Sequence, residues 1–178
     1  TVTRAEGNVV YEIDGRPAVE VFAHYAAQNQ LPFDARKPGP FFIENELGIY
    51  FFDEVVGVRA GLALRPDGGI LYAGQVPEES SVAIVRGDPG KLIDAAARAT
   101  EQARAEVDGA IAGVLVFTCV TRKTVLGVRY GDELRTIVDV LGSDVPVAGY
   151  ASYGEIATVR GKLGGYHNHT IVVAAIPA

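Results

Sequence analysis

A nearly continuous apolar run from Ile111 to Phe117 constrains the fold of this chain more than any other segment. Its length suits a strand, and it has no polar face, as expected for a central strand that is covered on both sides. Before it, Asp88-Pro89 places an N-cap ahead of a proline at the first helical position, which predicts a long helix to about Val107. After it, apolar residues at helical spacing predict a second helix from about Asp132 to Leu141. The chain must therefore build a sheet against which helices pack.

The N-terminal half is patterned for short strands and tight turns. Val9 to Ile13 predicts a strand, and Pro17 opens a helix whose apolar residues recur at i, i+3, i+4 and i+7. Leu31 to Pro40, which is rich in proline, predicts a loop, and Arg65 to Gly69 predicts the turn of a hairpin. The predicted fold is α/β (α+β mixed), a single domain with a central mixed β-sheet. It has β-hairpins in the N-terminal half and two helices packed on the sheet in the C-terminal half.

The charge and the residue usage exclude several classes of protein. Lys plus Arg number 16 and Asp plus Glu number 22, and the net charge of −6 with scattered basic residues predicts no nucleic-acid partner. The single cysteine excludes an intrachain disulfide. No apolar stretch approaches the ~20 residues of a membrane span and no signal peptide is evident, so we expect a cytoplasmic location and no membrane segment. Because the chain has no methionine, we interpret residues 1–178 as one domain excised from a longer chain.

Polar side chains gather where two predicted strands end. Cys119 and Arg122 follow the central strand, and Tyr150, Ser152 and Tyr153 follow the strand that comes after the second helix. If the connection between these strands is the usual parallel crossover, all of these residues leave the sheet at one edge. Ligands bind at the carboxyl ends of strands in open α/β sheets, so this edge is the predicted site.

A second polar group lies near the C-terminus, in the run from His167 to His169. We expect Val145–Val159 and His167–Ile176 to pair as one hairpin across a glycine-rich turn. Counting along this hairpin places Glu155 roughly opposite Thr170 and near the histidines. A slip of one residue in the register would reverse the faces of the strands.

Four segments carry a resemblance to a known family. They are the opening GNVVYEIDGRPAVEVFAHY, the middle VGVRAGLALRPDGGILYAGQVPE, the strand exit FTCVTRK, and the C-terminal GYASYGEIATVRG followed by YHNHTIVV. In this order they resemble the C-terminal FIST domain, a sensory module of bacterial signal-transduction proteins. The resemblance implies a small-molecule ligand, with amino acids as candidates. It also implies an upstream N-terminal FIST domain and an attached output signalling domain as partners.

A ligand pocket at the predicted edge needs few groups. The guanidinium of Arg122 suits a carboxylate, Glu155 suits an ammonium group, and tyrosine rings suit an apolar side chain. Such a pocket would bind a free amino acid or a similar zwitterion. The alternative is that Arg122 and Glu155 pair with each other or with solvent. The predicted ligand-binding residues are Cys119, Arg122, Tyr150, Tyr153, Glu155, His167, Asn168 and His169.

Two other kinds of site stay open at this stage. His167 and His169 on one face of a strand, together with Glu155, would suit a metal ion, but hairpin histidines are usually structural, so we assign no metal and expect no cofactor. Cys119 would be a nucleophile if a neighbouring cation made it a thiolate, but a buried cysteine at a strand end is usually inert.

The function predicted from the sequence is therefore a non-catalytic sensory input domain that binds a small polar metabolite. The main alternative is a protein-interaction domain without a small ligand. A Cys119-dependent hydrolase or transferase is the third interpretation.

Overall fold

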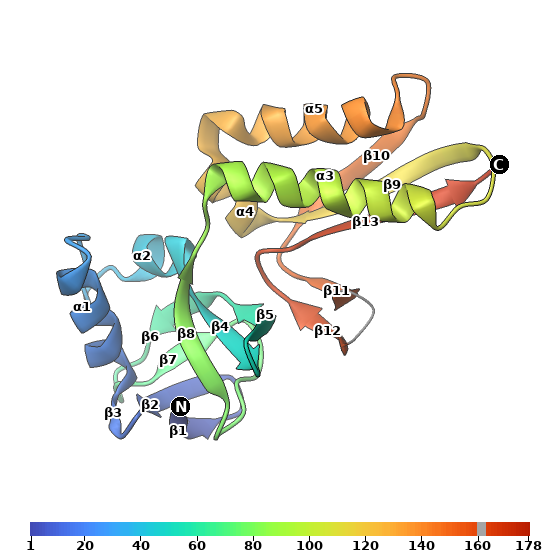
Figure 1. Cartoon of the computed structure of the whole chain (residues 1–178). Coiled ribbons are helices and arrows are strands. Elements are labelled where there is room, and N and C mark those ends of the chain that lie inside the picture. Colours follow the sequence, from blue (N-terminus) through green and yellow to red (C-terminus); the bar gives the residue numbers. More distant parts are fainter. Residues whose placement is uncertain (160–162) are drawn as a thin grey trace. The chain divides into compact units, whose positions relative to one another are not determined.

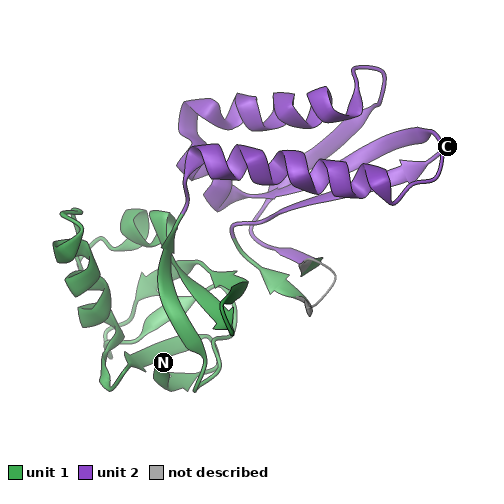
Figure 2. Ribbon diagram, in the orientation of Figure 1, with its two compact units in different colours: residues 1–86, 158–168 green, residues 87–157, 169–178 purple. Residues whose placement is uncertain are grey.

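The computed structural model of the chain describes residues 1–159 and 163–178. These residues form two compact units, which Figure 2 colours separately. Unit 1 comprises residues 1–86 and 158–168, and unit 2 comprises residues 87–157 and 169–178. The chain therefore crosses from one unit to the other at residues 86–87, 157–158 and 168–169.

Unit 1 is built mainly from antiparallel strands. Its helices and strands are β1 (Val2–Glu6), β2 (Val9–Ile13), β3 (Arg16–Pro17), α1 (Ala18–Gln28), α2 (Gly39–Glu44), β4 (Asn45–Phe51), β5 (Glu54–Arg59), β6 (Gly61–Leu64), β7 (Ile70–Tyr72), β8 (Ser81–Arg86) and β12 (Leu163–His167). One sheet has the order β1-β2-β7-β6 with β3 paired to β2, and another places β4 between β5 and β8 (Figure 1). The strand β11 (Glu155–Val159) pairs with β12 in a two-stranded sheet.

The aromatic core of unit 1 explains why its helices form where they do. α1 begins after Pro17, as predicted, and its buried residues recur one turn apart, with Phe22 fully buried. The ring of Phe22 meets that of Phe42 on α2 edge to face, with 5.3 Å between the ring centroids. Residues 31–38 form the predicted loop. The short helix α2 was not predicted, because its sequence alone resembles a proline-rich turn and its packing against this core is visible only in the structure.

Unit 2 contains the apolar run from which the fold was predicted. Its elements are α3 (Pro89–Ala105), β9 (Ile111–Cys119), α4 (Val120–Leu126), the 3₁₀ helix η1 (Gly127–Arg129), α5 (Tyr130–Leu141), β10 (Val147–Ser152) and β13 (Ile171–Pro177). β9 is the central strand, with β10 parallel on one side and β13 antiparallel on the other. α3 and α5 lie side by side over the sheet (Figure 1). The core between helices and sheet is formed by Ala96, Val114, Val116, Ile137 and Leu141.

The mixed α/β class is confirmed, and so are the two predicted helices, which correspond to α3 and α5. The strands, however, divide among several sheets, and the mixed sheet consists of β10, β9 and β13. The strands divide among several sheets because the buried apolar residues form two separate cores, one in each unit. Within residues 1–159 and 163–178, no helix has both the length and the apolar character that crossing a membrane requires.

The long hairpin predicted for residues 145–159 and 167–176 is wrong. β9 lies between β10 and β13, so these two strands pair with β9 and not with each other. The chain leaves the sheet after Ser152 and returns at Ile171, and only the short strands β11 and β12 pair in between. Counting along the sequence could not show that an earlier strand occupies the middle position. The predicted turn, Gly161–Gly165, includes residues that lie outside the described part of the chain.

Candidate functional site

The carboxyl ends of β9 and β10 meet at one edge of the sheet, as the predicted parallel crossover requires. Cys119, the last residue of β9, is opposite Ser152, the last residue of β10. The chain does not leave β9 in a loop, however, because α4 begins immediately at Val120. Thr121 and Arg122 therefore lie on a helix and are buried. The β-branched residues of this segment hid the helix, since they have low intrinsic helix propensity.

Arg122 forms a buried ion pair with Glu133 of α5. The Arg122 side chain is 2% exposed and that of Glu133 is fully buried. The guanidinium donates from Nε to Glu133 Oε1 over 3.0 Å and from Nη2 to the same carboxylate, and Nη2 also donates to the Leu92 carbonyl at 2.9 Å. This pair meets the polar requirements of both groups within the protein. Glu133 was not predicted from the sequence, although a glutamate in the first turn of an otherwise amphipathic helix was the available signal.

Glu155 accepts hydrogen bonds from two hydroxyl groups at the same edge, those of Ser152 and Thr170. The predicted proximity of Glu155 and Thr170 is thus observed, although through side chains and not through the predicted hairpin. Glu155 is 4% exposed. Burial raises the pKa of its carboxyl group, and the two hydroxyl donors together with the positive charge of Arg122 oppose this rise in part.

The raised pKa of Glu155 predicts how its replacement changes stability with pH. The native carboxyl group binds a proton more tightly than the unfolded one, whose pKa is near 4.5. The stabilisation from the protonated form is therefore complete below that value and is lost as the pH rises through the native pKa. Relative to Glu155→Gln, the parent should lose free energy of unfolding as the pH rises from about 4.5 through the native pKa of Glu155. Urea unfolding of both proteins across this range measures the difference, and a constant difference would contradict the prediction.

Cys119 and His169 are connected through the hydroxyl group of Thr121. This hydroxyl donates to Cys119 Sγ at 3.3 Å and lies 3.1 Å from His169 Nδ1. His169 has a left-handed φ of 60°, a conformation in which histidine is enriched among non-glycine residues. Cys119 is fully buried, so a substrate has no access to its sulfur.

His167 and Asn168 belong to unit 1, where Asn168 has a structural position. Its backbone N–H donates to the Val58 carbonyl, and its side-chain oxygen accepts from the N–H of Ala60, each over 3.1 Å. Its amide nitrogen donates to the Tyr166 hydroxyl, also over 3.1 Å. Both His167 and Asn168 are buried. These bonds link the segment after β12 to β5 and the residue that follows it, so the structure assigns Asn168 a role in holding unit 1 together.

The two predicted tyrosines lie at the surface. Tyr150 is 65% exposed and its ring meets that of Phe117 edge to face, with 5.3 Å between centroids. Tyr153 is 85% exposed. Among the predicted ligand-binding residues, the structure thus brings Cys119 and His169 together through Thr121, and places the charge of Arg122 within range of Glu155.

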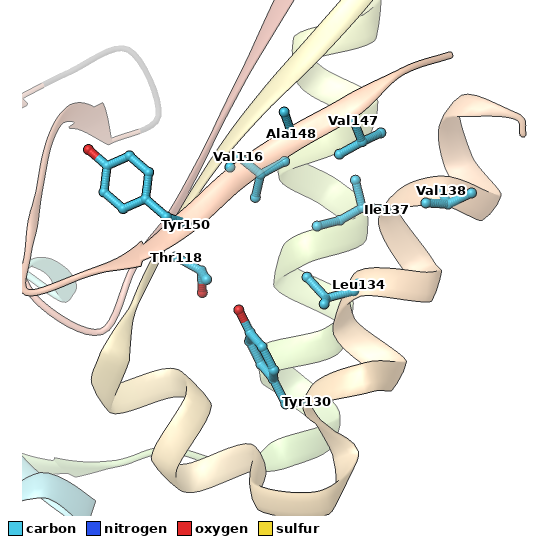
Figure 3. A pocket seen from close by; sticks show the side chains of 10 residues that line it. Val116, Thr118, Tyr130, Leu134, Ile137, Val138, Val147, Ala148 and Tyr150 are labelled. Atoms are coloured by element: carbon cyan, nitrogen blue, oxygen red, sulfur yellow. The ribbon is translucent and has the colours of Figure 1, made fainter. Parts of the chain in front are cut away.

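Unit 2 also has a cleft between α5 and β10. Its volume is about 310 Å³, and Figure 3 shows the side chains that surround it. The lining residues are Val116, Thr118, Tyr130, Leu134, Ile137, Val138, Val147, Ala148, Gly149 and Tyr150. Of the residues predicted to bind ligand, only Tyr150 is among them. Leu134 and Val138 remain 42% and 38% exposed, because α5 packs over β9 and leaves the inner surface of β10 uncovered.

The hydroxyl groups of Thr118 and Tyr130 form the polar end of this cleft. In Figure 3 they point toward each other from β9 and α5. Thr118 Oγ1 donates to Glu133 Oε2 at 3.2 Å, so the cleft is connected to the buried ion pair behind it. Burial and the negative charge of Glu133 raise the pKa of Tyr130, and Arg122 opposes this, so Tyr130 stays a neutral phenol. Neither residue was selected from the sequence.

The described residues include no group of three or more histidine, cysteine or acidic side chains that could hold a metal ion.

The fold and the cleft define a mixed α/β protein with a small apolar cleft beside the sheet of unit 2. A family model described as the FIST C domain matches residues 18–158. The chain belongs to the FIST C domain family, which is a sensory-type family and not a known catalytic one.

Two curated relatives are proteins of Mycobacterium tuberculosis, from two strains, and both are described as uncharacterized. Each is 30% identical to this chain over 166 residues. The alignment covers 90% of this chain and 43% of each relative, so the chain spans less than half of their length. No solved structure matches the chain.

Proposed function

We propose that the chain is the sensory input domain of a signalling protein and that the α5–β10 cleft binds a small metabolite. The observation that supports this function is the cleft itself, about 310 Å³ in volume and lined mainly by aliphatic side chains. Small-molecule sites are typically concave and apolar, with a few placed polar groups that orient the ligand. The function needs no chemical step, because a ligand that binds two conformations unequally shifts the population between them.

The proposal changes the roles of the residues selected from the sequence. Arg122 already neutralises Glu133, so it does not serve as a carboxylate partner in the proposal. The hydroxyl groups of Thr118 and Tyr130 bind the polar end of the ligand instead. The aliphatic wall formed by α5 and β10 binds its apolar body, which suits a metabolite with a branched aliphatic chain and a small polar head group.

The partners in this proposal come from the family. A FIST C domain belongs to a signalling context, so we place this chain in a longer protein with an upstream FIST domain and an output domain. The relatives provide room for such domains, since more than half of their length is not matched by this chain.

Thermal-shift measurements on the full chain test the proposed function. The panel contains amino acids, small aliphatic amines, alcohols and carboxylic acids. A ligand at 100 times its dissociation constant should stabilise the parent by about 2.7 kcal/mol. Leu134→Trp, which fills the cleft from α5, should abolish the shift, whereas Leu62→Trp at an exposed position of unit 1 should leave it unchanged.

A protein-interaction domain is the second candidate, and β10 is the observation that favours it. In the described sheet β10 is an edge strand, most of its residues are exposed, and none is charged. Exposed apolar edge strands can pair with another chain. No shift with any member of the panel, together with concentration-dependent association in sedimentation velocity, would favour this candidate over a ligand sensor.

A further inference from the structure

The polar end of the α5–β10 cleft contains hydroxyl groups but no formal charge. Thr118 and Tyr130 direct their hydroxyls into this end, whereas the ring of Tyr150 points away from it (Figure 3). Among the described residues that line the cleft there is no lysine, arginine, histidine, aspartate or glutamate. The orientation of these hydroxyl protons therefore determines which polar groups can bind.

Thr118 can act only as an acceptor toward a ligand. Its single proton is donated to Glu133 Oε2, and Glu133 is a carboxylate because it is paired with Arg122. A carboxylate can only accept hydrogen bonds, so the threonine must be the donor in this pair. The lone pairs of Thr118 Oγ1 remain for a donor on the ligand. Thr118 is 2% exposed, so a ligand group that lacks a donor would leave this oxygen poorly solvated.

The surroundings of Tyr130 disfavour negative charge at the same end of the cleft. The phenolate is destabilised by burial and by the charge of Glu133, with partial compensation from Arg122. A ligand carboxylate beside the phenol would meet the same unfavourable surroundings. The Tyr130 ring also already binds a cation, because the exposed ammonium of Lys123 lies 5.4 Å from its centroid. Lys123 is on α4 and does not line the cleft.

We propose that the cleft selects ligands whose polar group is a hydrogen-bond donor, best an aliphatic primary ammonium, and rejects carboxylates of the same shape. An ammonium offers three donors and no acceptor, so it matches the acceptor on Thr118 and can also donate to the oxygen of Tyr130. A neutral alcohol offers one donor and ranks second. A carboxylate finds one donor at most, the Tyr130 hydroxyl, and faces Thr118 lone pair to lone pair. This selectivity rests on the function proposed above.

Isothermal titration calorimetry of the full chain with three molecules of nearly equal shape tests the selectivity. These are 3-methylbutylamine, 3-methyl-1-butanol and 3-methylbutanoate, at one pH and one ionic strength. We expect the amine to bind at least about tenfold more tightly than the acid, with the alcohol in between. The amine gains a charge-assisted hydrogen bond to Thr118, whereas the carboxylate of the acid opposes the lone pairs of the same oxygen.

Two substitutions assign the selectivity to particular groups. Thr118→Val keeps the shape but removes the acceptor, so it should weaken amine binding about tenfold, whereas acid binding should not weaken because the opposed lone pairs are gone. Thr124→Val is the matched control, because Thr124 is exposed on α4 and its hydroxyl donates to the Val120 carbonyl. If Thr118→Val does not fold, Tyr130→Phe provides the second variant. It removes the one donor available to a carboxylate and leaves the acceptor on Thr118, so acid binding should weaken at least as much as amine binding and the preference for the amine should persist.

The outcomes separate this inference from the proposed function. Binding of 3-methylbutanoate as tight as that of 3-methylbutylamine, lost in Leu134→Trp, would overturn the selectivity and leave the ligand-binding function standing. An amine preference that survives Thr118→Val, or one that is lost in Tyr130→Phe, would also overturn it. No binding of any of the three molecules, with no response to the wider thermal-shift panel, would instead contradict the proposed function.

Discussion

Replacing Gly149 with alanine is expected to destabilise unit 2 by about 3 kcal/mol or more, at the upper end of what overpacking usually costs. Gly149 lies on β10 directly opposite Val116 of the central strand β9. A Cβ atom at this position would overlap the carbonyl oxygen of Val116 and lie 2.8 Å from its carbonyl carbon. Both atoms belong to the backbone of a strand that is paired on its other side with β13, so they cannot move aside without breaking the sheet.

Urea unfolding followed by circular dichroism measures this effect. Gly113→Ala is the matched control. Gly113 lies in the same sheet, on β9, and the nearest atom to a Cβ there is the Pro146 carbonyl oxygen, at 3.4 Å. The control should change the free energy of unfolding by no more than about 1 kcal/mol. A Gly149→Ala protein as stable as this control would show that the strands do not approach as closely as described.

Breaking the ion pair between Arg122 and Glu133 should have the other large effect. Glu133→Gln removes the charge that neutralises Arg122 but leaves the guanidinium buried among α3, α4 and α5. An unpaired buried charge costs about 3 to 5 kcal/mol. We therefore expect a loss of that size in urea unfolding.

A double replacement identifies the cause of this loss. In Arg122→Met with Glu133→Leu no buried charge remains, so most of the stability should return, as found for buried pairs replaced by apolar residues of similar volume. The exposed pair of Arg4 and Glu12 serves as the comparison, and Glu12→Gln should cost no more than about 1 kcal/mol. A Glu133→Gln protein that is no less stable than Glu12→Gln would mean that the pair is solvated and not buried.

The local pattern of the chain was enough to predict much of unit 2. The apolar run that became β9 and the capped helix that became α3 are features of single segments, and both are observed. The prediction of a parallel crossover followed from the usual geometry of strand–helix–strand units, and it correctly brought Cys119 and Ser152 to one edge. The hairpin failed because strand order depends on which distant strand takes the middle position. A count of residues between two segments contains no information about a third.

The site was predictable only in part, and for a related reason. The polar residues at the strand ends were found, but their partners were not. Glu133 is eleven residues from Arg122 in the sequence. The two side chains meet because α4, which carries Arg122, packs next to the first turn of α5, which carries Glu133. From the sequence, the alternative to a ligand pocket was an ion pair between Arg122 and Glu155. The structure assigns Glu133 to this role, and Glu155 instead accepts from Ser152 and Thr170.

The α5–β10 cleft could not be found from polar residues, because its walls are aliphatic. One signal was present in the sequence. Leu134, Ile137, Val138 and Leu141 form a wide apolar stripe on α5, and their helical spacing is typical of a face that packs against a core. In the structure only Ile137 and Leu141 are buried, and the remaining part of the stripe lines the cleft. When a helix has more apolar surface than its contact with the core covers, the exposed remainder indicates a binding surface for a ligand or a partner.

The central claim is that the α5–β10 cleft binds a small ligand, and nuclear magnetic resonance tests it most directly. The ¹⁵N-labelled full chain is titrated in turn with 3-methylbutylamine, 3-methyl-1-butanol and 3-methylbutanoate. We expect saturable changes in amide shifts that cluster at Thr118, Tyr130 and Gly149 and that disappear in Leu134→Trp. The absence of saturable changes with all three molecules, or changes located elsewhere that persist in Leu134→Trp, would contradict the claim.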